Sequence, residues 1–251
     1  MDSFFRKIKK GAAELQKAQR RIERASGPAR STPLRRSGPA EKAASTGGPA
    51  MDHERLDVNL GISQLPSDVE GFLKLRDQFS DTPAGAAAIF LLAMHMYGDE
   101  SELGLRCLTI AVDTTLLEAS SAGIGYKEKV LLQKERDRFA KVLKESPETA
   151  RGYWKGAGPD NGYTPETPLQ ATLYRQLSDG ETASQYTRAT RGTAQPEQRL
   201  FVMSEGYQNV KESGRPILLA RNTSGVWKAK GYAGVVWPVM KETVADDGDD
   251  L

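Results

Sequence analysis

The residues best suited to chemistry in this sequence lie within one stretch, residues 152–168. The stretch combines aromatic rings, a cation and hydrogen-bonding side chains with glycines and prolines that restrict the backbone. Rings and polar groups on such a loop suit the recognition of a ligand or of a partner protein. The candidate binding residues are Tyr153, Trp154, Lys155, Asp160, Asn161 and Tyr163. We call residues 152–168 the hinge, because helical patterning precedes them and strand patterning follows them.

The hinge also has a purely structural interpretation. Asn161 and Gly162 form a typical turn pair, and the prolines fix the direction of the chain. Trp154 and Tyr163 have the size to pack between helices and a sheet. Turn formation and packing explain every hinge position except Lys155, so the structural interpretation is the stronger of the two.

Elsewhere the sequence offers few groups for catalysis. Of its two histidines, we expect His53 at the edge of a linker and His95 within an apolar helix, where a structural role is the more common one. Cys107 is the only cysteine and is expected to be buried, so neither a Cys-His pair nor a three-ligand metal site is indicated. Phosphate-loop, hydrolase and dinucleotide-binding motifs are missing. We expect no catalytic residue, no metal and no cofactor.

Charge is distributed unevenly along the chain. The net charge is only +2, yet residues 1–45 carry 12 Lys or Arg against 4 Asp or Glu, a net charge of +8. The rest of the chain has 23 basic and 29 acidic residues, a net charge of −6. The sequence therefore predicts a basic segment attached to an acidic domain.

The basic segment has the pattern of an amphipathic helix. Between residues 4 and 22 apolar residues recur three and four positions apart, and Lys and Arg occupy the other faces. We call residues 1–25 the basic arm and predict that it docks on an anionic membrane or on a larger protein assembly. The predicted docking residues are Phe4, Phe5, Lys7, Ile8, Lys9, Lys10 and Leu15. Binding of the arm to nucleic acid is less favoured, because phosphate contacts do not require Phe4 and Phe5. The stripe could instead pack on the protein's own domain.

The segments beside the domain have compositions typical of disorder. Residues 26–52 are rich in Gly, Pro, Ser and Arg and are predicted to form a disordered linker, and residues 242–251 an acidic disordered tail. The first residues lack the pattern of a secretory signal, and no apolar run reaches the length of a membrane span. We therefore expect a cytoplasmic protein, with the arm allowing peripheral attachment at the inner face of the membrane.

Residues 53–241 are predicted to form a single α+β domain, with its folded part starting near Leu56. Helical periodicity, beginning with a capping box of Ser67 and Glu70, predicts four helices at 67–79, 84–97, 99–117 and 126–144. Alternating patterns predict strands at 169–174, 199–203, 215–221 and 225–229, with a last short element at 235–239. The expected fold is a helical N-terminal half packed on a small, mainly antiparallel sheet, preceded by a detached basic amphipathic helix.

The hinge resembles the signature of a bacterial domain family of unknown function. The signature is an aromatic residue followed by Lys-Gly-Ala, then Pro, an acidic residue, Asn-Gly and Tyr-Thr-Pro, which here occupy 154–157 and 159–165. The likeness continues at 215–219 and 225–228, so it covers residues 56 to 239. Glu212-Ser213-Gly214 is shorter than the loop expected in relatives. The resemblance supports the domain boundary and implies no known reaction, cofactor or catalytic residue.

These observations predict a non-enzymatic cytosolic adaptor, whose α+β domain binds a protein partner while the basic arm docks elsewhere. An enzyme or small-ligand-binding protein with a pocket at the hinge is the alternative. Nucleic-acid binding through the arm is a second alternative.

Overall fold

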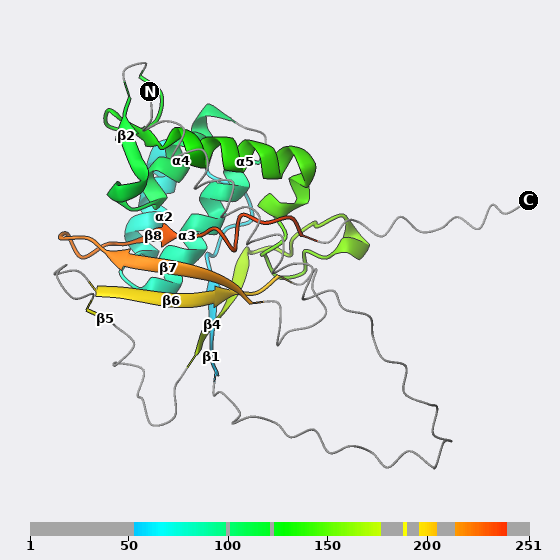
Figure 1. The fold of residues 1–251 in the computed structure, drawn as a ribbon. Helices are drawn as coiled ribbons and strands as arrows, with labels where there is room; N and C mark the ends of the chain where they lie inside the picture. Colours follow the sequence, from blue (N-terminus) through cyan, green and yellow to red (C-terminus); the bar gives the residue numbers. More distant parts are fainter. Residues whose placement is uncertain are drawn as a thin grey trace, which may run out of the picture. The chain divides into compact units, whose positions relative to one another are not determined.

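The computed structural model describes residues 53–98, 101–120, 123–176, 188–189, 196–204 and 214–239 (Figure 1). The chain divides into two units, residues 1–48 and 49–251, and the described residues all belong to the second unit. The basic arm with its docking residues, the linker at 26–52 and the acidic tail lie outside the described residues.

The described residues form an α+β fold, as predicted. Its helices are α2 (Val69–Phe79), α3 (Pro83–Met96), α4 (Glu102–Ala111) and α5 (Gln133–Glu145), with short 3₁₀ turns η1 (Thr114–Leu116), η2 (Pro147–Ala150) and η3 (Pro159–Asn161). The strands of the main sheet are β1 (His53–Asn59), β4 (Gln170–Gln176), β5 (Arg188–Ala189), β6 (Pro196–Val202), β7 (Arg215–Arg221) and β8 (Trp227–Gly231). A second, two-stranded sheet consists of β2 (Leu117–Ala119) and β3 (Lys129–Leu131).

The main sheet has the strand order β1-β4-β6-β7-β8, with β5 paired to β6, and each of these pairings is antiparallel. β1 pairs with β4 over its whole length, so the first strand of the domain adds to a sheet whose other strands come more than 100 residues later. Between β7 and β8 the register shifts at Leu218 and Leu219. Such an irregularity alters which side chains of the last strand face each side of the sheet.

Helix α3 is the centre of the hydrophobic core. It lies across one face of the sheet and contacts β1, β4, β6, β7 and β8, while α2 and α4 pack on its other sides (Figure 1). Every residue from Gly85 to Met94 is buried. A helix that is apolar on all sides is stable only when it is surrounded, and the sequence prediction of a central core helix is confirmed.

Three consecutive helices begin with the same local arrangement. An N-cap side chain accepts a hydrogen bond from the backbone N–H of a glycine three residues later, in the pairs Asp68–Gly71, Thr82–Gly85 and Ser101–Gly104. The cap satisfies a backbone donor that the first turn leaves free. The predicted cap at Thr82 is confirmed, whereas the predicted cap at Ser67 is wrong by one residue, since Asp68 takes this place.

The structure corrects the predicted starts and ends of several elements. The predicted helix 99–117 ends at Ala111, because Val112 is extended and pairs with Ala229, and Asp113 N–H donates to the Ala229 carbonyl at 2.8 Å. The predicted helix 126–144 begins only at Gln133. Lys127 and Glu128 both have positive φ, which favours a turn over a helix, and this turn precedes strand β3.

The sequence analysis missed strand β1, although Leu56 and Val58 alternate with polar residues as in a half-buried strand. In the structure the residues of β1 alternate between exposed and half-buried positions, and Arg55 and Asp57 lie on the exposed side. His53, expected at the edge of a linker, is the first residue of this strand. The expected short element at 235–239 is not a strand, although Val235, Val236 and Val239 are buried.

Candidate functional site

The aromatic side chains of the hinge face the interior of the domain. Tyr153, Trp154 and Tyr163 are each at most 2% exposed. The Tyr153 hydroxyl donates a hydrogen bond of 2.6 Å to the carbonyl oxygen of Val235, and the backbone of Trp154 forms a bridge with Ala171 of β4. The hinge is therefore joined to the segment after β8 by the Tyr153 hydroxyl and to β4 by the backbone of Trp154.

Asn161 holds the middle of the hinge together through its side-chain amide. Its Nδ2 donates to the carbonyl oxygens of Gly156 and Thr164 at 2.5 and 3.1 Å. Its Oδ1 accepts from the backbone N–H groups of Gly158 and Thr164 at 3.1 and 3.2 Å. These four bonds use the donors and acceptor sites that an amide side chain possesses. Asn161 thus fixes the loop while remaining exposed.

Lys155 and Asp160 are the exposed charged members of the predicted hinge site. Lys155 Nζ lies 3.5 Å from Glu166 Oε2, with both side chains about half exposed or more, so the pair is solvated. The structure brings the six predicted residues onto one loop but separates them, with rings directed inward and Lys155, Asp160 and Asn161 at the surface. Ligand or partner binding by that surface stays a prediction.

The other two residues considered for chemistry, His95 and Cys107, lie on helices that form the hydrophobic core. His95 is half-buried on α3, and its ring centroid lies 6.4 Å from that of Trp154. Cys107 is completely buried on α4, and burial raises the pKa of its thiol to about 12. A thiol with such a pKa stays protonated at neutral pH and is a poor nucleophile.

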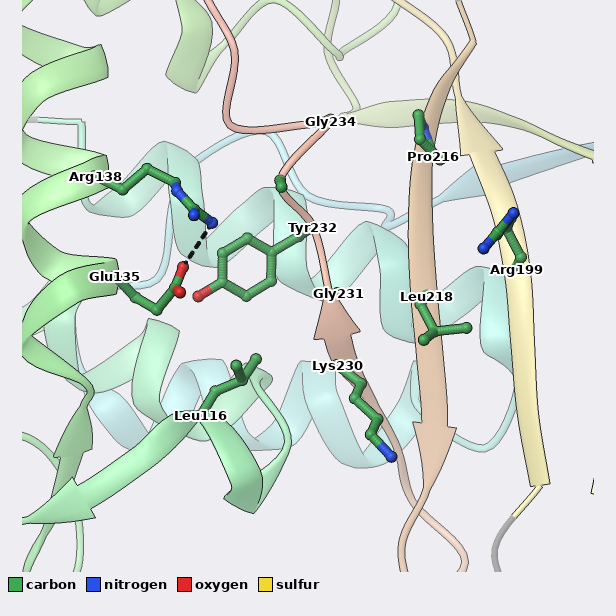
Figure 2. A pocket seen from close by; sticks show the side chains of 11 residues that line it. Leu116, Glu135, Arg138, Arg199, Pro216, Leu218, Lys230, Gly231, Tyr232 and Gly234 are labelled. Carbon is green, nitrogen blue, oxygen red and sulfur yellow. Dashed lines mark hydrogen bonds and ion pairs between the residues drawn. The ribbon is translucent and has the colours of Figure 1, made fainter. Parts of the chain in front are cut away.

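A pocket of about 420 Å³ opens at the β8 edge of the main sheet. Its lining comes from η1, α5, β6, β7, β8 and the turn after β8. The lining residues are Leu116, Glu135, Arg138, Arg199, Pro216, Leu218, Lys230, Gly231, Tyr232, Ala233 and Gly234. Figure 2 shows Glu135 and Arg138 on α5 at one wall, Arg199 and Leu218 at the other, and the ring of Tyr232 between them. This pocket is separate from the hinge residues.

One wall of the pocket is a polar group in which Glu135 and Tyr232 are buried and Arg138 is exposed. Glu135 and Tyr232 are 4% and 2% exposed, and Arg138 Nη1 lies 3.0 Å from Glu135 Oε2. The Tyr232 ring is fixed by Phe90, whose centroid lies 4.7 Å away in a stacked arrangement, and by Phe139 at 5.6 Å. Burial, followed by the negative charge of Glu135 and contact with it, raises the pKa of Tyr232. The Tyr232 hydroxyl therefore keeps its proton.

The opposite wall is formed by the main sheet and carries two basic residues, Arg199 and Lys230. Arg199 on β6 is exposed and lies opposite Leu218 on β7. Lys230 on β8 reaches back to β6, where its Nζ lies 2.5 Å from Glu197 Oε1. The hydrogen bond to Glu197 is the main cause that raises the pKa of Lys230, so this side chain stays positively charged.

The turn after β8 comes close to β7 because Gly234 has no side chain. A Cβ atom on Gly234 would lie 2.7 Å from Pro216 Cδ, which is closer than nonbonded carbon atoms approach. Glycine at this position thereby allows the turn to form the third side of the pocket.

The sequence analysis missed this pocket. Its residues span positions 116 to 234 and come from elements that only the tertiary fold brings together. The one local signal is Lys230-Gly231-Tyr232-Ala233-Gly234, an aromatic residue flanked by glycines and preceded by a cation. Glycines beside a polar aromatic residue permit a close backbone approach, but the pattern is short and common.

Two further findings concern only the described part of the chain. Within it, His, Cys, Asp and Glu side chains form no group of three that could hold a metal ion. None of the helices that the structure describes is both long and apolar enough to cross a bilayer.

Comparison with known proteins agrees with the resemblance seen in the sequence. A family described as "Domain of unknown function (DUF6935)" matches residues 64–242, which is most of the chain and includes all four described helices and strands β2 to β8. Neither a curated protein nor a solved structure matches the chain. The predicted membership in a family of unknown function is confirmed, and the chain belongs to the DUF6935 family.

Proposed function

We propose that this protein is a non-enzymatic adaptor, in which the basic arm docks on an anionic membrane and the α+β domain binds a protein partner. The observation that carries the proposal is the division of the chain into two units of opposite charge. Residues 1–48 form one unit and residues 49–251 the other, and the net positive charge is concentrated in the first. Each unit is thereby suited to a different partner.

The pattern of the arm favours a membrane over other anionic surfaces. Phe4, Phe5 and Ile8 supply an apolar stripe that can enter the interface between headgroups and acyl chains. Lys7, Lys9 and Lys10 lie among these residues, and each basic residue near an anionic bilayer contributes about 1 kcal/mol. Stripe and charge together support binding more strongly than either alone.

The linker would couple binding of the basic arm to binding of the domain, because it tethers one to the other. For residues 26–52, whose composition is typical of a flexible chain, the root-mean-square span is about 25 to 30 Å. A tether of this length raises the local concentration of the second binding site once the first is occupied. On the domain, the exposed hinge residues Lys155, Asp160 and Asn161 are the proposed contacts to the protein partner.

Vesicle co-sedimentation of the full chain tests the role of the arm. We expect binding to vesicles of phosphatidylserine and phosphatidylcholine, weak binding to phosphatidylcholine alone, and at least about a tenfold loss when Lys7, Lys9 and Lys10 are changed to Glu. The matched control changes Lys134, Lys141 and Lys144, three exposed lysines of α5, to Glu. Equal losses in both variants, or no binding to the anionic vesicles, would contradict the membrane role and leave a protein assembly as the docking site of the arm.

Affinity capture with the full chain tests the role of the hinge surface. We expect the double variant Lys155→Glu, Asp160→Lys to lose captured protein while its Tm stays unchanged, because both side chains are exposed. The control exchanges the charges of Glu70 and Lys74, an exposed ion pair on α2. Unchanged capture by the hinge variant would contradict the proposed role of the hinge surface in binding the partner.

A further inference from the structure

We propose that a second copy of this chain pairs with the outer edge of β1, the edge opposite to β4. In the resulting dimer the two β1 strands lie antiparallel about a twofold axis at Leu56 and join the two main sheets into one. The inference concerns β1 alone and does not depend on the adaptor role.

The outer edge of β1 is available for pairing. β1 is at one end of the strand order, and no other strand or bridge of the described residues pairs with its outer edge. Such an edge presents a row of backbone N–H and C=O groups that a strand of another chain can use. β1 is seven residues long, which is enough for several pairs of hydrogen bonds.

The hydrogen bonds of the sheet show which residues of β1 direct their backbone groups to the outer edge. Leu60 N–H donates to the Leu169 carbonyl at 2.9 Å, in the register that joins β1 to β4. In an antiparallel pair the bonded positions repeat at every second residue. The backbone groups of Leu56 therefore point to β4, and those of Arg55 and Asp57 point outward.

The neighbouring strand gives the same answer independently. Thr172 of β4 lies opposite Asp57, and its carbonyl accepts a hydrogen bond of 3.0 Å from the N–H of Met203, which follows β6. The Thr172 carbonyl thus points away from β1. Thr172 and Asp57 are a non-hydrogen-bonded pair, so the N–H and carbonyl of Asp57 face the outer edge.

The outward positions limit the register in which two copies of β1 can pair. Outward-facing residues must pair with outward-facing residues, so the twofold axis passes through a residue of β1 and not between two residues. With the axis at Leu56, Arg55 of each copy lies opposite Asp57 of the other. With the axis at Arg55 or at Asp57, two like charges would lie directly opposite and destabilise the pair. Axes nearer to either end would pair fewer residues.

The charges of β1 are complementary to themselves in this register. Arg55 and Asp57 have side chains that are 57% and 38% exposed, and Arg55 Nε lies 3.0 Å from Asp57 Oδ2. Thr172 Oγ1 donates to Asp57 Oδ1 at 2.8 Å and holds the carboxylate on the same face. In the dimer two arginines and two aspartates would alternate in one cluster, in which each guanidinium keeps its own carboxylate and gains a second. Charges on an edge strand usually prevent pairing, but this order of charges favours a second copy of the same strand.

The other face of β1 carries apolar surface that the domain leaves partly exposed. Leu56 and Val58 pack on the core but are only half-buried, whereas Leu173 and Ala171, opposite them on β4, are completely buried. In the dimer the two Leu56 side chains meet at the axis in a non-hydrogen-bonded pair, where side chains approach most closely. Removing this surface from water adds to the stabilisation from the backbone hydrogen bonds.

The oligomeric state of the full chain tests the proposal. We expect sedimentation equilibrium to show a reversible monomer–dimer equilibrium, and a chain that remains monomeric up to about 100 μM would overturn the proposal. Arg55→Asp and Asp57→Arg each create two pairs of like charges across the axis, so each should weaken dimerisation at least about tenfold. Arg199→Asp, at an exposed position of the interior strand β6, is the matched control and should dimerise as the parent does. Equal dimer affinity in Arg55→Asp and Arg199→Asp would also overturn it.

Mixing the two single variants separates strand pairing from misfolding. Arg55→Asp makes the face of the strand acidic at both positions and Asp57→Arg makes it basic at both, so each variant repels itself and complements the other. We expect an equimolar mixture to form heterodimers at least about tenfold more tightly than either variant forms homodimers. The double variant Arg55→Asp, Asp57→Arg should dimerise as the parent does. Failure of both the mixture and the double variant to restore dimerisation would overturn the register at Leu56.

Discussion

The Tyr153 hydroxyl donates a 2.6 Å hydrogen bond to the carbonyl oxygen of Val235, a residue 82 positions later in the chain. Both residues are buried. A second contact runs in parallel, because the backbone N–H of Val239 donates to Thr149 Oγ1 at 3.3 Å. The segment after β8 is therefore fastened to the hinge and to the turn before it. This segment also carries the turn that forms one side of the pocket.

Removal of the Tyr153 hydroxyl should destabilise the domain. Tyr153→Phe leaves the Val235 carbonyl buried without its donor, so we expect the free energy of unfolding to fall by about 1 to 3 kcal/mol. Urea denaturation measures the change. Tyr126→Phe is the control, because it removes the same hydroxyl from a half-buried tyrosine. The contact described for the Tyr126 ring is with the Lys127 side chain and does not involve the hydroxyl. If the two variants unfold at the same urea concentration, the hydrogen bond contributes nothing.

The glycines at the starts of α2 and α4 should respond in opposite ways to replacement by alanine. A Cβ at Gly104 would lie 2.4 Å from the Met96 carbonyl oxygen, whereas a Cβ at Gly71 meets nothing closer than 3.4 Å. We expect Gly104→Ala to cost about 3 kcal/mol or more through overpacking against backbone. Gly71→Ala should be neutral or stabilising by up to about 1 kcal/mol, since alanine favours helix. Thermal unfolding compares them. Similar Tm values would mean that α3 and α4 pack less closely than described.

Substitution of two polar hinge residues, Asn161 and Lys155, should change the stability of the domain by different amounts. Asn161→Ala removes four hydrogen bonds that fix the loop and should lower the free energy of unfolding by about 1 to 3 kcal/mol. Lys155→Ala removes a solvated ion pair and should change it by less than about 0.5 kcal/mol. Chemical denaturation of both variants checks this. A large loss for Lys155→Ala would indicate that its contact with Glu166 is structurally important.

Burial of Cys107 should make the stability of the domain depend on alkaline pH. Burial raises the pKa of the thiol from 9.0 to about 12, so between these values the folded protein keeps a proton that the unfolded chain releases. This contribution is complete below pH 9 and is lost as pH rises towards 12, by up to about 1.4 kcal/mol per pH unit. Cys107→Ala should therefore show a shallower decline of unfolding free energy than the parent. Parallel declines in urea denaturation at several pH values would contradict burial of the thiol.

The sequence by itself predicted those features that depend on local pattern. The apolar run from Ala84 to Met94 determines a surrounded helix, because a helix that is apolar on every side is stable only when it is buried on every side. The cap at Thr82, the turn at 222–225 and the strand at 215–221 follow from residue types within a few positions of each other. The resemblance to a family of unknown function agrees with the family match over residues 64–242.

Only the tertiary structure decided which elements meet. Strand β1 pairs with β4, a partner more than 100 residues away, and the alternating pattern of β1 does not identify that partner. Helix α4 ends where Val112 pairs with Ala229, again a distant residue. Tyr232, Glu135 and Arg199 form a pocket because α5, β6 and the turn after β8 converge there. Local propensity acts over a few residues, whereas burial and strand pairing depend on contacts between distant segments, so the pocket was beyond the reach of the sequence.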